Sequence, residues 1–262
     1  MDIKKFIVTA VLASAALHAA PVGNTSAPDL IEKGLFSTCN DTVDFRLGYE
    51  GDFVSDGRMQ QQGGGRVDNY SQDTNSATLT CNFQNRMDIY GVFGSSETEV
   101  DWRFTDPADQ IVRIEANTKS AFLWATGLRV ILVEWCNTSL GCGARYSSSH
   151  YRLSSLYSDG IAASTEGAHF HWREWQVNLD ISYKIHLFTP YIGVKYSSAH
   201  ADLNHFSVPI ASNGSGDNDL KNRNPVGLYL GCSLSTGKYV MLNVEGRLID
   251  EEAVTISGDI RF

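Results

Sequence analysis

The sequence holds two groups of residues whose types and spacing could bind a metal ion. His169 and His171 stand two positions apart in "HFHW", so both imidazoles would face one side of a strand. The stretch "GSGDNDLKNRN" at 214–224 carries carboxylate and amide oxygens that suit Ca²⁺ but lacks the EF-hand pattern. No spacing supplies a third ligand to the histidines. We therefore expect a solvated histidine pair and a solvated loop, and we predict no metal and no cofactor.

Catalytic motifs are weak in this chain. "STGK" at 235–238 has the end of a phosphate-binding loop without its upstream glycine, which favours a tight turn. Ser, His and Asp occur, but no nucleophile elbow surrounds a serine. We predict that the protein is not an enzyme.

Charged residues that alternate with apolar ones suggest a different chemistry, that of a pore. Acidic and basic groups facing each other across a water-filled channel create a field that orients polar solutes and sets ion preference. The acidic excess would give a mild preference for cations. The alternative is that the charges pair with one another and fill the interior. The candidates are Asp44, Arg46, Glu50, Asp52, Glu174, Asp180, Lys184, Lys195, Glu245, Arg247, Asp259 and Arg261.

These charges belong to long runs with a period of two. The runs are "VDFRLGYEGDFV", "WREWQVNLDISYKI", "TPYIGVKYSS", "KYVMLNVEGRL" and the C-terminal "VTISGDIRF". Strands of soluble proteins average about five or six residues, whereas a tilted membrane-spanning strand needs about nine to eleven. The pattern predicts an all-β fold, a transmembrane antiparallel β-barrel of about 12 strands (range 10–16). A β-sandwich with shorter strands is the competing interpretation.

The lengths of the connections predict the orientation of such a barrel. Long polar or Gly-rich connections at about 55–75, 148–169 and 200–224 follow odd-numbered strands of the expected set, and short turns follow even-numbered ones. Barrels of the bacterial outer membrane have long external loops and short periplasmic turns. An even strand count then places both termini in the periplasm.

The N-terminus has the pattern of a cleaved secretory signal. Lys4 and Lys5 precede the apolar run "FIVTAVLASAAL", and Leu17 and Ala19 occupy the −3 and −1 positions of a cleavage site. We expect residues 1–19 to be the signal peptide, 20–42 an N-terminal periplasmic segment and 43–262 the barrel domain. The formal net charge of −9 argues against a nucleic acid as partner.

Five cysteines are present: Cys39, Cys81, Cys136, Cys142 and Cys232. Export permits disulfides, and an odd number leaves at least one thiol free or paired between chains. We expect intermolecular disulfides at the periplasmic rim. Aromatic residues near expected strand ends could form interfacial girdles or pack in the interior: Tyr70, Trp102, Trp135, Trp172, Trp175, Tyr191 and Tyr239.

Several blocks of sequence are similar to one known family. They are "PVGNTSAPDL", "LGYEGDFV", "EWCNTSLG", "EWQVNLDISYKIHLFTPYIGVKYSS" and "KYV…VEGRLIDEEAV…RF". Together they resemble the chlamydial major outer membrane protein family of porins, of which this chain would be a shortened member. The blocks cover about half of the chain that follows the signal, and the missing length falls in the first half and in the loops.

The resemblance implies a porin of the bacterial outer membrane that passes small hydrophilic solutes and ions. It also implies a homotrimer, disulfide cross-linking that supports the envelope, contact with outer-membrane lipid, and insertion by the barrel assembly machinery. Such barrels commonly end in an aromatic residue that this machinery reads, which makes Phe262 the assembly signal. Two alternatives remain: a structural or adhesive barrel with a closed lumen, and an exported soluble β-protein.

Overall fold

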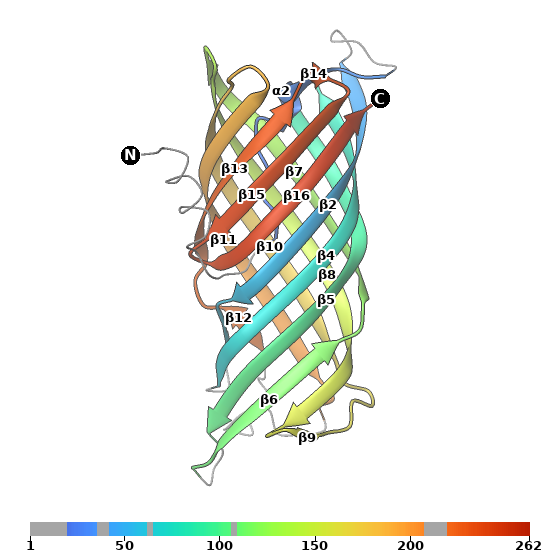
Figure 1. The fold of residues 1–262 in the computed structure, drawn as a ribbon, viewed down its shortest axis with the longest axis vertical. Helices are drawn as coiled ribbons and strands as arrows, with labels where there is room; N and C mark the ends of the chain where they lie inside the picture. Colours follow the sequence, from blue (N-terminus) through green and yellow to red (C-terminus); the bar gives the residue numbers. More distant parts are fainter. Residues whose placement is uncertain (1–19, 36–41, 62–64, 106–108, 207–218) are drawn as a thin grey trace, which may run out of the picture.

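The computed structural model describes residues 20–35, 42–61, 65–105, 109–206 and 219–262 (Figure 1). The described chain is all-β apart from the four-residue helix α2 (Ala27–Leu30). In these ranges no helix has the length and apolarity needed to cross a membrane.

Long strands make up nearly all of the fold. They are β2 (Val43–Gly57), β4 (Arg66–Phe83), β5 (Met87–Thr105), β6 (Ile111–Thr118), β7 (Ala121–Trp135), β8 (Thr138–Ser158), β10 (His169–Tyr183), β11 (Phe188–Asn204), β13 (Val226–Ser235), β15 (Val240–Leu248) and β16 (Glu251–Arg261). The short strands are β1 (Ile31–Lys33), β3 (Met59–Gln61), β9 (Ile161–Ala162), β12 (Leu220–Asn222) and β14 (Gly237–Lys238).

The long strands pair in chain order and the sheet closes on itself. Each pairs antiparallel with the next along the chain, apart from β6, which pairs with β5 and β8, and β16 returns to β2 with Arg261 opposite Arg46 and Glu251 opposite Gly57. Figure 1 shows the resulting closed sheet, with β16 beside β2. Closure satisfies the backbone groups that an edge strand would leave unpaired.

The ring consists of ten strand positions, at the lower end of the predicted range and below the central value of twelve. The expected strands 86–94 and 98–104 are one continuous strand, β5. β6 and β7 lie end to end, because both pair with β5 on one side and with β8 on the other. The count is even, so the start of β2 and the end of β16 lie at one end, which we call the near end.

Close to the near end, the usual distribution of side chains in a protein is reversed. On β10 the outward residues Trp175, Val177, Leu179, Ile181 and Tyr183 are 42–50% exposed. The residues between them, Glu174, Gln176, Asn178, Asp180 and Ser182, are buried inside the sheet. An apolar exterior over a polar interior is the pattern expected where lipid, and not water, surrounds a closed sheet.

Toward the far end the pattern inverts. In β5 the inward positions Val100, Trp102 and Phe104 are buried, while Glu99 and Arg103 face outward. Inward apolar residues from β3 to β12 form one core there, in which Tyr70 stacks on Trp172 with ring centroids 5.4 Å apart. Burial of each large apolar side chain contributes roughly 2–3 kcal/mol. We call the part of the sheet with the apolar exterior and polar interior the near half, and the part that encloses the apolar core the far half. The far half therefore has the arrangement of a water-soluble protein.

The two halves decide between the alternatives left open for the aromatic residues. Tyr70, Trp102, Trp172 and Tyr191 are buried inside the sheet, whereas Trp135, Trp175 and Tyr239 are exposed on the outside. The far half exists because some strands are far longer than a membrane requires. β8 has 21 residues, which corresponds to about 70 Å at the rise of an extended chain.

Candidate functional site

The interior of the near half is occupied by the chain's own N-terminal segment. We call residues 20–31 the inner segment. Its backbone N–H groups at Val22 and Gly23 donate to the Glu245 carboxylate at 3.0 and 2.8 Å. Thr25 donates to Asp180 through its backbone N–H at 3.3 Å and its hydroxyl at 2.6 Å. Two buried carboxylates thus bind this segment through four donors.

The carbonyl groups of the inner segment are bound by buried donors. The Pro21 carbonyl accepts from Arg145 at 3.2 Å and from Gln176 at 3.0 Å. Nearer the near end, the Ala27 carbonyl accepts from Arg46 at 3.0 Å and the Leu30 carbonyl from Ser235 at 2.5 Å. Figure 1 shows helix α2 at the same end as the C-terminus. Most of the inner segment, which is the first part of the predicted N-terminal periplasmic segment 20–42, lies inside the sheet.

Two glycines make room for this segment. A Cβ atom on Gly141 of β8 would lie 2.1 Å from the Thr25 hydroxyl oxygen. Gly23 has a φ of +71°, and a Cβ there would lie 2.6 Å from the Arg129 guanidinium. A side chain at either position would collide with the groups that seat the segment, so both glycines are needed for close approach.

The remaining interior is filled by ion pairs. Arg247 bonds Asp52 at 2.7 Å and Glu251 at 2.5 Å. Further pairs join Lys195 to Glu251 and to Asp250, Arg145 to Glu50, Arg46 to Asp88, and Arg261 to Asp44. Asp250 lies in the β15–β16 connection, and burial raises the pKa of its carboxyl, which Lys195 partly opposes. The two cavities lined by Ala20 and by Gly23 measure only about 20 Å³, room for about one water each. A larger cavity, of about 220 Å³, lies beside Leu30 at the near end.

Of the twelve predicted pore residues, the structure places ten in the buried interior: Asp44, Arg46, Glu50, Asp52, Glu174, Asp180, Lys195, Glu245, Arg247 and Arg261. Asp259 also faces inward, beside Gly23 and Arg129. Lys184 differs, because it follows the end of β10 and its side chain is 40% exposed, 3.4 Å from Asp29. The strand has ended there, so alternation no longer sets the direction of its side chain.

Sequence reasoning missed several interior charges, among them Asp250 and Glu251, which pair with Lys195. Asp88, Arg129 and Arg145 lie inside the sheet on β5, β7 and β8. The signal was present in "AFLWATGLRV", where Arg129 shares the parity of the small residues Ala125 and Gly127. Arg145 likewise shares the parity of Gly141. Small residues on these faces weaken the apolar–polar contrast from which a face is assigned.

Histidines gather on the outer surface of the far half. His171 stacks on His150 with ring centroids 3.8 Å apart, and His169 on His205 at 5.5 Å. The two imidazoles considered as shared metal ligands therefore each face a different ring.

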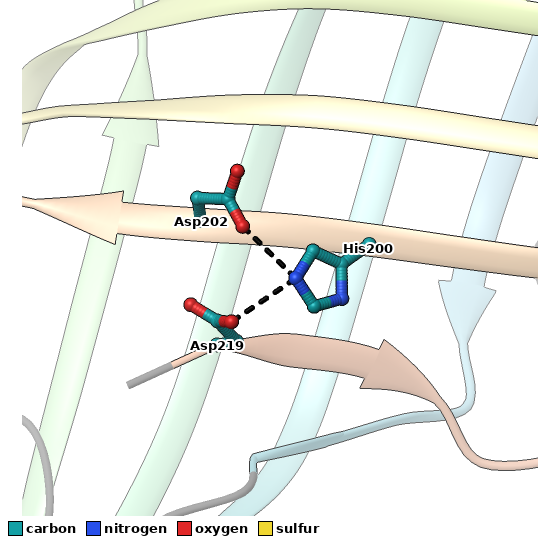
Figure 2. Close-up of side chains that lie close together, drawn as sticks. All are labelled: His200, Asp202 and Asp219. Carbon is teal, nitrogen blue, oxygen red and sulfur yellow. Dashed lines mark ion pairs between the residues drawn. The ribbon is translucent and has the colours of Figure 1, made fainter. Parts of the chain in front are cut away.

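A second histidine cluster joins β11 to the chain just before β12. His200, Asp202 and Asp219 have ligand atoms within 4.8 Å of one another. Figure 2 shows His200 Nε2 between the carboxylates, at 2.9 Å from Asp202 and 3.0 Å from Asp219. These are hydrogen-bond separations, and a tetrahedral metal would hold its ligand atoms about 3.3 Å apart. Arg173 also binds Asp202 at 2.5 Å. We interpret the cluster as a hydrogen-bonded link between β11 and the chain just before β12.

The described cysteines are free thiols. Cys81, Cys142 and Cys232 are partly exposed on the outward faces of β4, β8 and β13, and Cys136 is exposed in the β7–β8 turn. Cys39 lies outside the described residues.

Comparison with known proteins identifies relatives of this closed sheet. The family model described as "Chlamydia major outer membrane protein" matches residues 155–216. The chain is 24% identical over 390 aligned positions to the major outer membrane porin, serovar E, of Chlamydia trachomatis, covering 99% of both chains. The resemblance predicted from the sequence is confirmed.

The same similarity extends to the major outer membrane porin of Chlamydia muridarum, with 24% identity over 400 positions and 99% of both chains covered. These porins are longer than this chain, which has 262 residues. Among solved structures, an outer membrane channel from Pseudomonas putida F1 has a TM-score of 0.43 with 8% identity, covering 85% of this chain and 96% of the channel. The translocator domain of the autotransporter NalP from Neisseria meningitidis has a TM-score of 0.42 with 10% identity, covering 85% and 89%.

Proposed function

We propose that this chain is an outer-membrane porin whose interior is closed by its own inner segment until that segment is displaced. The observation that carries the proposal is the similarity over 99% of the chain to proteins named major outer membrane porins. The inverted near half supports it, because an apolar exterior over a charged interior suits a pore in lipid. Small polar solutes and ions are the cargo that such an interior would pass.

The two halves suggest how the barrel sits in the membrane. Lipid would surround the near half, where Trp175 and Tyr196 mark the last outward apolar positions before His200 and Asp202. The far half, with charged residues outside and apolar ones inside, would project beyond the cell. The start of β2 and the end of β16, both at the near end, would then face the periplasm, in keeping with a chain exported by a signal at 1–19.

Barrel size limits what the pore can carry. Barrels of about eight strands have interiors that side chains alone can fill, whereas 16–18 strands leave a wide aqueous channel. Ten strands fall near the lower limit, which explains why a single peptide segment and a few ion pairs fill the near half. With the inner segment displaced, the pore-residue candidates other than Lys184 would line a narrow passage with charges of both signs.

A second candidate function is a structural or adhesive barrel with a closed lumen. The observation that favours it is the apolar core of the far half, where Trp102, Tyr151 and Phe170 pack inside the sheet. This core closes the interior a second time, independently of the inner segment. An adhesive role would use the charged outer surface of the far half.

Liposome swelling and planar-bilayer conductance distinguish the two candidates. The mature chain is reconstituted beside a variant lacking residues 20–30, and heat-modifiable migration on gels verifies the folded barrel in both. Passage of ions or sugars by either protein supports a porin. No passage by either one, with both folded, rejects the porin in favour of the structural barrel.

A disulfide-linked homotrimer would give the barrel its envelope role. Cys136 is the best placed thiol, because it is exposed in a short turn at the near end. We expect the full chain to form covalent oligomers on non-reducing gels of envelopes, Cys136→Ser to remove them, and Cys142→Ser, on a strand face, to leave most of them. An unchanged ladder in Cys136→Ser would show that this thiol does not link the chains.

Phe262 would be the signal for the barrel assembly machinery. Its backbone N–H donates to the Phe45 carbonyl at 2.9 Å, so it extends the seam between β16 and β2 by one bond. We expect deletion of Phe262 to lower the amount of folded barrel in the outer membrane while leaving the conductance of inserted molecules unchanged. Normal surface levels of the deletion variant would contradict the role.

A further inference from the structure

The inner segment begins beside the buried carboxylate of Glu174, which accepts a hydrogen bond from a backbone nitrogen. The nitrogen of Ala20 lies 3.1 Å from Oε1 of Glu174 on β10. Within the part of the chain that the structure describes, the Glu174 carboxylate accepts this one hydrogen bond. Its side chain is only 4% exposed. A buried carboxylate held by one neutral amide is poorly compensated, because a buried charge needs a partner of opposite sign.

The charge inventory around Glu174 points the same way. The inward carboxylates of the near half and its rim include Asp44, Glu50, Asp52, Asp88, Glu174, Asp180, Glu245, Asp250, Glu251 and Asp259. The cations that face them are Arg46, Arg129, Arg145, Lys195, Arg247 and Arg261. Carboxylates outnumber cations, and Glu251 and Asp52 already bind Arg247. One further positive charge at the position of the Ala20 nitrogen would reduce the deficit.

The sequence supplies such a charge at this atom. The −3 and −1 pattern of Leu17 and Ala19 predicts that processing leaves Ala20 as the first residue. The Ala20 nitrogen would then be an α-ammonium, which is largely protonated at neutral pH and has three donors instead of one. A charge-assisted hydrogen bond to a carboxylate is about twice as strong as a neutral one.

The space beside Ala20 fits a chain end. The cavity there is lined by Ala20, Asp52, Arg145, Glu174 and Glu251, among others, and measures about 20 Å³. That volume holds about one water, which an ammonium could bind with its remaining donors. Trp172, a member of the apolar core, also lines this cavity. The inner segment thus begins, at Ala20, where the polar interior meets the apolar core.

We propose that Glu174 is a binding site for the free α-ammonium of Ala20, so that removal of the signal peptide completes the seating of the inner segment. Hydrolysis of the Ala19–Ala20 peptide bond by the exporting peptidase consumes one water and leaves the Ala19 carboxylate and the Ala20 amine. The amine, protonated, binds Glu174. Closure of the barrel is in this way coupled to processing. The proposal builds on the closed barrel described above, and its test does not depend on conductance.

The test measures whether the inner segment is seated. Ser233 is fully buried and bonds Asn24 of the segment, so a thiol at this position is shielded while the segment is in place. Ser233→Cys is introduced into a background whose native cysteines are serine, and its reaction with a charged maleimide is followed by intact mass. The same spectra report the N-terminal residue of the exported chain.

Three forms are compared in folded barrels: the chain as processed, Glu174→Gln, and a chain with Gly-Ser-Gly-Ser inserted between Ala19 and Ala20. Glu99→Gln, on the outward face of β5, is the matched control. We expect the first residue to be Ala20 and the labelling rate to rise about tenfold in Glu174→Gln and in the extended chain, the factor expected from losing one charge-assisted hydrogen bond. Glu99→Gln should leave the rate unchanged.

Other results overturn the proposal. They are a mature chain that begins elsewhere, an extended chain as well protected as the processed one, or a Glu174→Gln variant with the rate of Glu99→Gln. Loss of porin activity with the labelling pattern intact would reject the proposed function and leave the binding site in place.

Discussion

Deleting residues 20–30 should expose the interior of the near half to water. The segment binds Glu245 and Asp180 through backbone and hydroxyl donors and covers Ser233 through Asn24. Without it, water replaces these contacts, because the carboxylates and guanidinium groups that remain are strongly hydrated. We expect a thiol at Ser233→Cys to react with a charged maleimide at least about tenfold faster, the change that corresponds to a closing free energy of about 1.4 kcal/mol or more.

The apolar core provides the internal control for this experiment. Ala199 faces the interior of the far half and is 6% exposed. The core that surrounds it is formed by residues between Met59 and Leu220 and includes no residue of the inner segment, so a thiol at Ala199→Cys should stay protected in both forms. Rapid labelling of Ala199→Cys after the deletion would show that the whole barrel had opened. Slow labelling of Ser233→Cys would show that the segment does not close the near half.

A point variant separates displacement of the segment from its deletion. In Gly141→Ala the new Cβ would lie 2.1 Å from the Thr25 hydroxyl oxygen, so the segment must move away from β8. Gly246→Ala is the matched control, because the nearest atom to its Cβ is 4.0 Å away. With Gly141→Ala present, the thiol of Ser233→Cys should therefore react with the maleimide at a rate between the rates measured in the full chain and in the deletion variant.

The sequence predicted the barrel wall well because the wall follows from a simple period. Successive side chains of "WREWQVNLDISYKI" point to opposite faces of the sheet, and an apolar exterior requires only that the outward residues be apolar. The strand count came out too high because the period of two does not show where one long strand ends and another begins. The break expected at 95–97, between the expected strands 86–94 and 98–104, lies within the continuous ladder of β5.

The contents of the barrel could not be predicted in the same way. Val22 and Gly23 bind Glu245 through backbone N–H groups, which every residue except proline has, so their side chains give no signal. The apolar core was hidden by a change of phase: outward positions of β5 pass from Ile89 and Phe93 to Glu97 and Glu99 without a break in alternation. When one face of a whole strand is assigned as apolar and the other as polar, a change of the apolar face from outside to inside along the strand goes unnoticed.

Arg247 should be the most sensitive single residue for stability. Its guanidinium is fully buried and bonds Asp52 at 2.7 and 3.0 Å, Glu251 at 2.5 Å and the Thr255 hydroxyl. These partners come from β2 and β16, the two strands that close the ring. Arg247→Met keeps much of the side chain's volume but leaves the buried Asp52 without its cation and Glu251 with Lys195 alone. Breaking a buried pair in this way typically costs about 3–5 kcal/mol.

The expected result is a large shift of the urea midpoint for the folded barrel in detergent, followed by heat-modifiable migration and tryptophan fluorescence. Arg173→Met is the matched control, since its pair with Asp202 is on the outer surface and its side chain is 44% exposed. An exposed pair contributes about 0–1 kcal/mol, so the control should shift little. Double replacement with Asp52→Asn should recover part of the loss in Arg247→Met, because it removes one uncompensated charge. If Arg247→Met unfolds no more easily than Arg173→Met, water reaches this part of the interior and the ion pairs do not hold the seam between β16 and β2.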